Sequence, residues 1–111
     1  MPRPKKRRIL QRVPHPAVYK PAGIPLNDLR LVTLLHEELE ALRLADLEEL
    51  SQAQAASNMG VSRSTFQRML ANARRQVSLA LVEGCALQVV GGSFDVAVPA
   101  RRRSYNRVRN G

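Results

Sequence analysis

The sequence predicts a small, mainly α-helical protein in which two helices form a helix-turn-helix, with a short C-terminal β-hairpin and flexible basic tails. Three observations favour this class: two helix-capping signals on either side of a glycine, an apolar stripe at helical spacing, and clusters of cations at both ends of the chain. The 111 residues include 18 Lys and Arg but only 9 Asp and Glu, which gives a formal net charge of +9. Such a charge is typical of a protein that binds a polyanion.

Residues 1–26 precede the predicted helical domain. The first twelve residues, 1–12, form a basic arm with six cations and no acid. In residues 13–26, four prolines predict an extended connector that is neither a helix nor an interior strand, because proline fixes φ and removes an amide donor. No run approaches the ~20 apolar residues of a membrane span, and the basic arm contains no apolar stretch of signal-peptide length. We therefore expect a cytoplasmic protein.

Residues 27–84 are predicted to form the helical domain. The part up to residue 47 has apolar residues at helical spacing, and either Asn27 or Thr33 is a candidate N-cap, so this part is one helix or two. It supplies the wall against which the two following helices bury their apolar residues. Cys85 is the single cysteine of the chain, so an intramolecular disulfide is excluded, and we expect this side chain to be a small buried hydrophobe.

The acidic residues are concentrated in residues 28–49, which hold seven of the nine. Glu37, Glu38 and Glu40 crowd one helix turn without a partnering His, Lys or glycine-rich loop, so we interpret them as a solvated first turn that suits the helix dipole. His15 precedes a proline, and His36 has no Cys or second His at ligand spacing. The sequence therefore predicts no metal site, no cofactor and no enzymatic activity.

Two helix caps give the strongest local signals. Ser51 followed by Gln54 forms a capping box, which predicts that a helix begins at residue 52. Gly60 stands where that helix must end and the chain must turn sharply, in a conformation with positive φ that glycine adopts without steric cost. After the turn, Ser62 is the predicted N-cap of a second helix.

The apolar residues of this segment predict that the two helices pack as a helix-turn-helix over residues 51–77. Phe66 and Met69 begin a stripe that follows the spacing of an amphipathic helix. Small alanines on the first helix let the two helices approach closely. The second helix is expected to continue until Gly84.

The opposite face of the second helix carries polar and basic side chains and no acid. Side chains of these types can read base edges in the major groove, a role that we assign to Arg63, Ser64, Gln67, Arg68 and Ala71. Phosphate contacts are expected from the helix and from both tails, at Ser62, Thr65, Arg74, Arg75, Lys5, Lys6, Arg7, Arg8, Arg101, Arg102 and Arg103. Double-stranded DNA is therefore the predicted ligand. The alternative is an ordinary helical hairpin whose arginines are merely solvated.

Beyond the second helix, apolar residues alternate about two adjacent glycines, which predicts a short β-hairpin over residues 85–98. Residues 99–111 form a second basic tail, with five cations and no acid. Neither basic tail alternates cations with the large apolar residues of a membrane-surface helix, and the few aromatic residues offer no stacking platform for single-stranded RNA. Because one helix-turn-helix covers few base pairs, such modules act in pairs or in larger assemblies. The hairpin either joins two copies into a homodimer or folds back on its own helices.

The string EALRLADLEELSQAQAASNMGVSRSTFQRML, with YKPAGIPL before it and paired glycines after it, resembles a prokaryotic family catalogued as domain of unknown function 134. The resemblance covers roughly residues 2–94 and is most specific at residues 21–26, 40–47 and 60–63. It implies a cytoplasmic DNA-binding protein, by preference a transcriptional regulator, with a helix-turn-helix like that of sigma factor region four.

The family pattern maps onto the first helix start, the turn and the recognition helix, at Ser51, Gln52, Gly60, Val61, Ser62, Arg63, Thr65, Phe66 and Arg68. Many family members carry a cysteine in the N-terminal basic cluster, where this chain has Arg7 and Arg8, so a redox or metal role of that cysteine does not transfer. The alternative function is a protein-interaction module that docks on RNA polymerase or a sigma factor and contacts nucleic acid only non-specifically.

Overall fold

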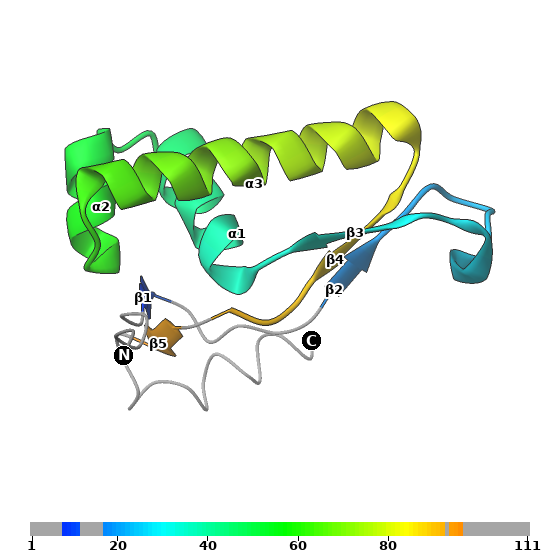
Figure 1. The fold of residues 1–111 in the computed structure, drawn as a ribbon, viewed down its shortest axis with the longest axis horizontal. Helices are drawn as coiled ribbons and strands as arrows, with labels where there is room; N and C mark the ends of the chain where they lie inside the picture. Colours follow the sequence, from blue (N-terminus) through cyan, green and yellow to red (C-terminus); the bar gives the residue numbers. More distant parts are fainter. Residues whose placement is uncertain (1–7, 12–16, 93, 97–111) are drawn as a thin grey trace, which may run out of the picture.

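The computed structural model describes residues 8–11, 17–92 and 94–96. Their elements, in chain order, are β1 (Arg8–Leu10), β2 (Ala17–Tyr19), the 3₁₀ turn η1 (Leu26–Asp28), β3 (Leu31–Leu34), α1 (His36–Leu42), the π-helical turn η2 (Arg43–Leu47), α2 (Gln52–Met59), α3 (Arg63–Glu83), β4 (Ala86–Val89) and β5 (Phe94–Val96). The predicted mainly helical class is confirmed. Figure 1 shows α3 along one side of the molecule, with α1 and α2 beside its first half and a small sheet beneath its second half.

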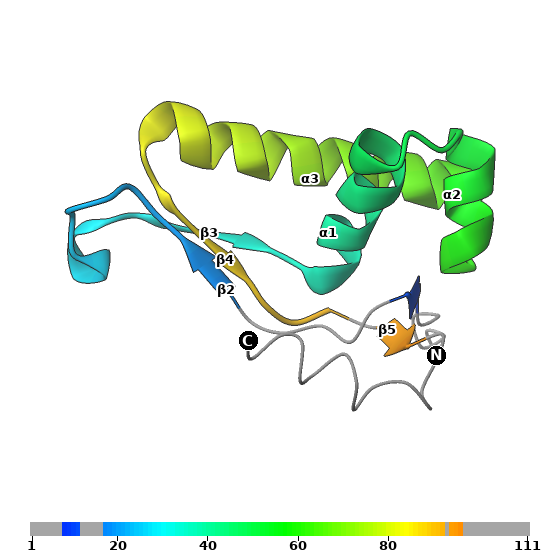
Figure 2. The same ribbon diagram turned by 180° about the vertical axis from the view of Figure 1, so that it is seen from behind.

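The strands form two sheets. In the larger sheet, the order is β2-β4-β3, and β4 pairs antiparallel with β2 and parallel with β3. In the smaller sheet, β1 and β5 pair in parallel, so that the first and last described strands lie side by side beneath α1 and α2 (Figures 1 and 2).

The predicted β-hairpin over residues 85–98 is wrong in its pairing. Both expected strands exist, but both edges of β4 are taken by β2 and β3, and β5 joins β1 instead. Gly91 and Gly92 have φ of 68° and 101°, and they lead the chain past α1, where the Gly91 carbonyl accepts a hydrogen bond from the His36 amide at 3.4 Å. Alternation of apolar residues predicted the strands correctly, but it carries no information about which strand is the partner.

The helical prediction for residues 27–47 is wrong in its first half. Residues 31–34 form β3, and α-helical structure begins only at His36. Val32 and Leu34 are buried while their neighbours in the strand are exposed, which is the burial pattern of a strand with one covered face. Pairing with β4, far away in the sequence, thus outweighs the local helical spacing.

The two N-terminal predictions have different outcomes. The connector contains β2, which is an edge strand, in agreement with the exclusion of an interior strand. The basic arm, by contrast, is part of the fold from Arg8 onward, because Leu10 is only 3% exposed and belongs to the main core.

The core divides along α3. The first half of α3 packs on α1, α2 and β1 through large side chains, among them Phe66, Leu70 and Met59. The second half packs on the sheet through small side chains: Ala73 lies with Leu34 and Val89, and Ala80 lies with Val32 and Cys85. Cys85 is buried, as predicted. α3 is therefore a single 21-residue helix that two separate packing units share.

Candidate nucleic-acid interface

The caps that position the interface are those that the sequence predicts. The Ser51 hydroxyl accepts a hydrogen bond from the Gln54 amide at 3.1 Å, and α2 begins at the next residue. The Ser62 hydroxyl accepts from the Thr65 amide at 3.1 Å, and α3 begins at residue 63. Between the helices, Gly60 has φ of 68°.

Gly60 is required for a second reason that sequence analysis does not find. A Cβ atom built at this position would lie 3.1 Å from Cδ1 of Ile9, so β1 packs directly against the turn. The turn is therefore held from both sides, by the helix caps and by the N-terminal strand.

The five residues assigned to base reading all lie in the first half of α3 and are all exposed: Arg63, Ser64, Gln67, Arg68 and Ala71. Arg75 is exposed further along the helix. Within the part of the chain that the structure describes, no carboxylate forms an ion pair with any of the three arginines Arg63, Arg68 and Arg75. The first half of α3, with Arg75 just beyond it, therefore presents unneutralised cations to solvent.

The predicted phosphate-binding residues fall into different environments. The hydroxyls of Ser62 and Thr65 are engaged with each other in the cap, at 3.0 Å. Arg74 forms a two-point ion pair with Asp46, with Nη2 2.6 Å from Oδ1 and Nε 3.1 Å from Oδ2. Hydrogen bonding from Arg74 lowers the pKa of the Asp46 carboxyl. The charge of Arg74 is thus already paired, and that of Arg75 is not.

The structure replaces the expected phosphate contact of Arg8 with an internal one. Arg8 is only 8% exposed, and its Nε atom lies 3.5 Å from Oε2 of Glu37. A buried guanidinium loses its hydration, so it needs an internal carboxylate more than an external phosphate. The other predicted tail contacts, Lys5, Lys6, Arg7, Arg101, Arg102 and Arg103, lie outside the described residues.

The interpretation of Glu37, Glu38 and Glu40 as a solvated turn is wrong, because all three are buried. Burying a carboxylate costs several kcal/mol unless it is paired, and each of these has a partner in a different segment. Glu38 accepts from the Leu35 amide at 2.9 Å, which caps α1, and its second oxygen accepts from the Asn72 side chain on α3. It thereby fixes α1 to the centre of α3.

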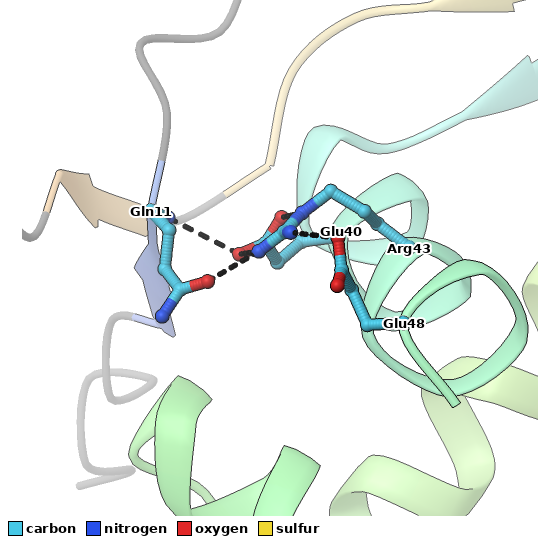
Figure 3. A network of polar contacts seen from close by, with 4 residues as sticks. All are labelled: Gln11, Glu40, Arg43 and Glu48. Carbon is cyan, nitrogen blue, oxygen red and sulfur yellow. Dashed lines mark hydrogen bonds and ion pairs between the residues drawn. The ribbon is translucent and has the colours of Figure 1, made fainter. Parts of the chain in front are cut away.

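Glu40 is the centre of a network that ties β1 to α1 (Figure 3). Its two oxygens accept from Nε and Nη2 of Arg43, at 2.9 and 3.1 Å, and from the Gln11 amide at 3.1 Å. Arg43 also hydrogen-bonds to the Gln11 side chain and to Glu48, at 3.3 Å from the latter. The hydrogen bond to Glu40 raises the pKa of the Arg43 guanidinium, although burial acts in the opposite direction.

Glu37 is the third of these buried carboxylates, and it lies against the C-terminal part of the fold. A Cβ atom built on Gly92 would lie 2.8 Å from Oε1 of this carboxylate, so the glycine leaves the room that the side chain occupies. Glu37 thus contacts β1 through Arg8 and the loop before β5 through Gly92. Local sequence gives no signal of these roles, because the partners of the three carboxylates stand many residues away.

Two kinds of feature are absent from the described residues. No group of three or more His, Cys, Asp or Glu side chains among them is arranged to hold a metal ion. None of the helices in the described part of the chain combines the length and apolar character needed to cross a membrane.

Known proteins resemble this chain in sequence over most of its length. A family profile described as "Protein of unknown function DUF134" matches residues 1–97. A UPF0251 protein from Dehalococcoides mccartyi strain BAV1 is 55% identical over 96 residues, which cover 86% of this chain and 82% of the relative. A UPF0251 protein from Pelotomaculum thermopropionicum is 49% identical, over 85% of this chain and 71% of the relative. A UPF0251 protein from Rhodospirillum rubrum is 53% identical, over 83% of this chain and 64% of the relative. No solved structure matches the chain.

Proposed function

The chain belongs to the family described as protein of unknown function DUF134, and we propose that it is a prokaryotic, sequence-specific double-stranded DNA-binding protein that regulates transcription in the cytoplasm. In this proposal, α2, the turn and α3 act as a DNA-binding helix-turn-helix like that of sigma factor region four. The first half of α3 enters the major groove, which is wide enough to admit an α-helix.

The observation that carries the proposal is the acid-free, exposed face of α3. Arg63, Arg68 and Arg75 have no carboxylate partner in the described part of the chain, whereas Arg8, Arg43 and Arg74 all do. Arginines that served only the fold or solubility would be expected to share the available carboxylates. Along α3, three exposed arginines are left unpaired, and Arg30 is the one other arginine of the described residues without a carboxylate partner; such a concentration on one helix favours an external polyanion as the partner.

The roles of individual residues follow from their positions. Arg68 and Gln67 are exposed near the middle of the first half, where side chains reach base edges, and guanine and adenine are the bases that their groups pair with. Arg63 stands at the first position of α3, where the free amides and the helix dipole also favour a phosphate. Arg75 lies three turns further along, so we assign it a phosphate contact.

Selection from a pool of random duplexes tests the proposal. The purified full chain is mixed with the pool, and the retained DNA is sequenced after several rounds at fixed salt concentration. We expect enrichment of a short motif. Retention without enrichment would contradict base reading and favour the alternative, a module that docks on RNA polymerase or a sigma factor and holds nucleic acid non-specifically. No retention at low salt would exclude both DNA-binding models.

A further inference from the structure

The end of the molecule away from the turn carries an apolar hollow. It has a volume of about 340 Å³ and lies between the second half of α3 and the strands β2 and β4. Its wall consists mainly of apolar side chains: Tyr19, Pro21, Val77, Ala80, Leu81 and Leu87. We call this hollow and its rim the distal groove; in Figure 1 it belongs to the end where α3 turns yellow and meets the sheet.

Large hydrophobic side chains remain exposed at this end. Leu81 is 78% exposed, Val82 is 79% exposed and Tyr19 is 62% exposed. Four more exposed large hydrophobic residues lie at this end: Val18, Ile24, Leu26 and Leu31. In the described ranges, the remaining two exposed large hydrophobic residues, Leu39 and Leu47, lie elsewhere. Scattered exposed apolar side chains are normal, but a concentration on one end, beside an apolar hollow, marks an interaction surface.

We propose that the distal groove binds a second copy of this chain and forms a homodimer. A two-fold interface brings the same patch of each copy together, so the patch must hold both a projection and a hollow. The distal groove holds both, because Leu81 projects from the rim of the hollow that Val77, Ala80 and Leu87 line. Each copy can place its Leu81 against the hollow of the other.

Charge supports this choice of partner. The chain has a net charge of +9, so most faces of two copies repel each other. Among the described residues, the distal end is an exception: its exposed charged side chains are two cations and two anions, Lys20, Arg30, Asp28 and Glu83. A neutral, mixed-sign rim around an apolar centre lets identical chains approach, and it offers little to a strongly charged partner.

The dimer also suits the proposed function, and this step rests on that function. Leu81 lies about a third of a turn around the α3 axis from Arg68 and Arg75, so pairing there leaves the basic face open. From Gln67 to Glu83, α3 rises about 24 Å, and two such helices joined at their C-terminal ends reach up to about 48 Å. Inclined to the duplex, they span the separation of about 34 Å between successive major grooves.

Sedimentation equilibrium without DNA tests the interface. We expect a dimer for the wild type at micromolar concentration. Leu81→Lys should raise the dimer dissociation constant at least about a hundredfold, because each dimer then carries two ammonium groups at the centre of its interface. Tyr19→Lys on the opposite rim should act in the same direction. The matched control is Leu47→Lys, which changes a side chain that is 71% exposed at the other end of the molecule and should leave the dimer intact.

A wild type that is monomeric up to high micromolar concentration would overturn the inference, and so would Leu81→Lys and Tyr19→Lys proteins that remain dimers. Thermal unfolding followed by circular dichroism checks that the variants are folded, as expected for substitutions at exposed positions. Because the measurement contains no DNA, its outcome is independent of the random-duplex selection. A dimer without motif enrichment contradicts only the DNA-binding proposal, and enrichment by a monomer contradicts only the dimer.

Discussion

The two halves of α3 differ in what they bury and in what they expose. The first half buries Phe66 and Leu70 among α1, α2 and β1, and it exposes arginines. The second half buries Ala73 and Ala80 on a three-stranded sheet, and it exposes Leu81 and Val82. One continuous helix thus joins a basic surface at one end to an apolar surface at the other, and the change in its exposed face indicates two separate interaction surfaces.

The difference in buried side chains has a geometric reason. A helix that packs on other helices interdigitates large side chains with theirs, whereas small residues let a helix lie close on the flat face of a sheet. Truncating a large buried side chain of the first half should therefore lower the free energy of unfolding more than truncating an exposed apolar side chain of the second half.

The largest expected effect comes from Phe66→Ala. Phe66 is completely buried, and its loss should lower the free energy of unfolding by about 3–5 kcal/mol, a large part of the stability of a domain of this size. Leu81→Ala, in the exposed part of the second half, should change it by less than about 0.5 kcal/mol. Urea unfolding of the two variants at a concentration where all proteins have the same oligomeric state measures both. Similar losses would remove the distinction between the halves.

The next effect concerns DNA binding by the basic face of α3. Arg68→Ala should weaken binding to the selected site by about 1–3 kcal/mol and relax its base preference, because a two-point base contact is lost. Arg75→Ala should weaken binding to selected and random duplexes alike. Titrations of both duplexes at one salt concentration separate these results. If Arg68→Ala lowers affinity for both duplexes by the same factor, then Arg68 does not read bases.

The two serine caps provide a smaller, matched test. Ser51→Ala and Ser62→Ala each remove a hydroxyl that accepts one amide hydrogen bond at 3.1 Å, and each should cost about 1 kcal/mol of stability. Only Ser62 stands at the start of α3, so only Ser62→Ala should also weaken DNA binding. Thermal unfolding and duplex titration of both variants give the comparison. Equal losses of DNA affinity would show that the effect is general and not specific to the reading helix.

The smallest effect belongs to the exposed ion pair between Asp46 and Arg74. Because Arg74 lowers the pKa of Asp46, the pair stabilises the fold above the usual pKa of an aspartate, and this contribution is lost as the pH falls through the lowered value. Arg74→Gln should therefore reduce stability by about a few tenths of a kcal/mol at neutral pH, and by less in acid or in high salt. Unfolding of both proteins is measured across pH, and a difference in stability between the wild type and Arg74→Gln that grew in acid would contradict this prediction.

The parts of the fold that sequence predicts correctly are the local ones. The caps at Ser51 and Ser62, the positive φ of Gly60 and the end of α3 at Gly84 each depend on interactions within a few residues, and the structure confirms them. Their side chains and amides lie within one or two helical turns, so residue type and spacing contain the necessary information.

The parts that sequence does not predict depend on distant partners. β3 lies in a segment with helical apolar spacing and becomes a strand because β4 pairs with it. Glu38 and Glu40 look solvated in the sequence, but Asn72 and Gln11, which bond to them, are 34 and 29 positions away. For the candidate interface, sequence placed the exposed residues of α3 correctly, yet it did not indicate that Arg8 pairs with Glu37 and Arg74 with Asp46.

The parallel pairing of β1 with β5 has a consequence for the order of folding. The two strands are the first and last described elements, so their contact closes a loop that contains all the others. The contacts among α1, α2 and α3 join segments that lie closer together in the sequence, so they need the closure of shorter loops only. We expect the helices to assemble first and β1 and β5 to pair last. During synthesis, β1 can therefore take its final place only after β5 has been made.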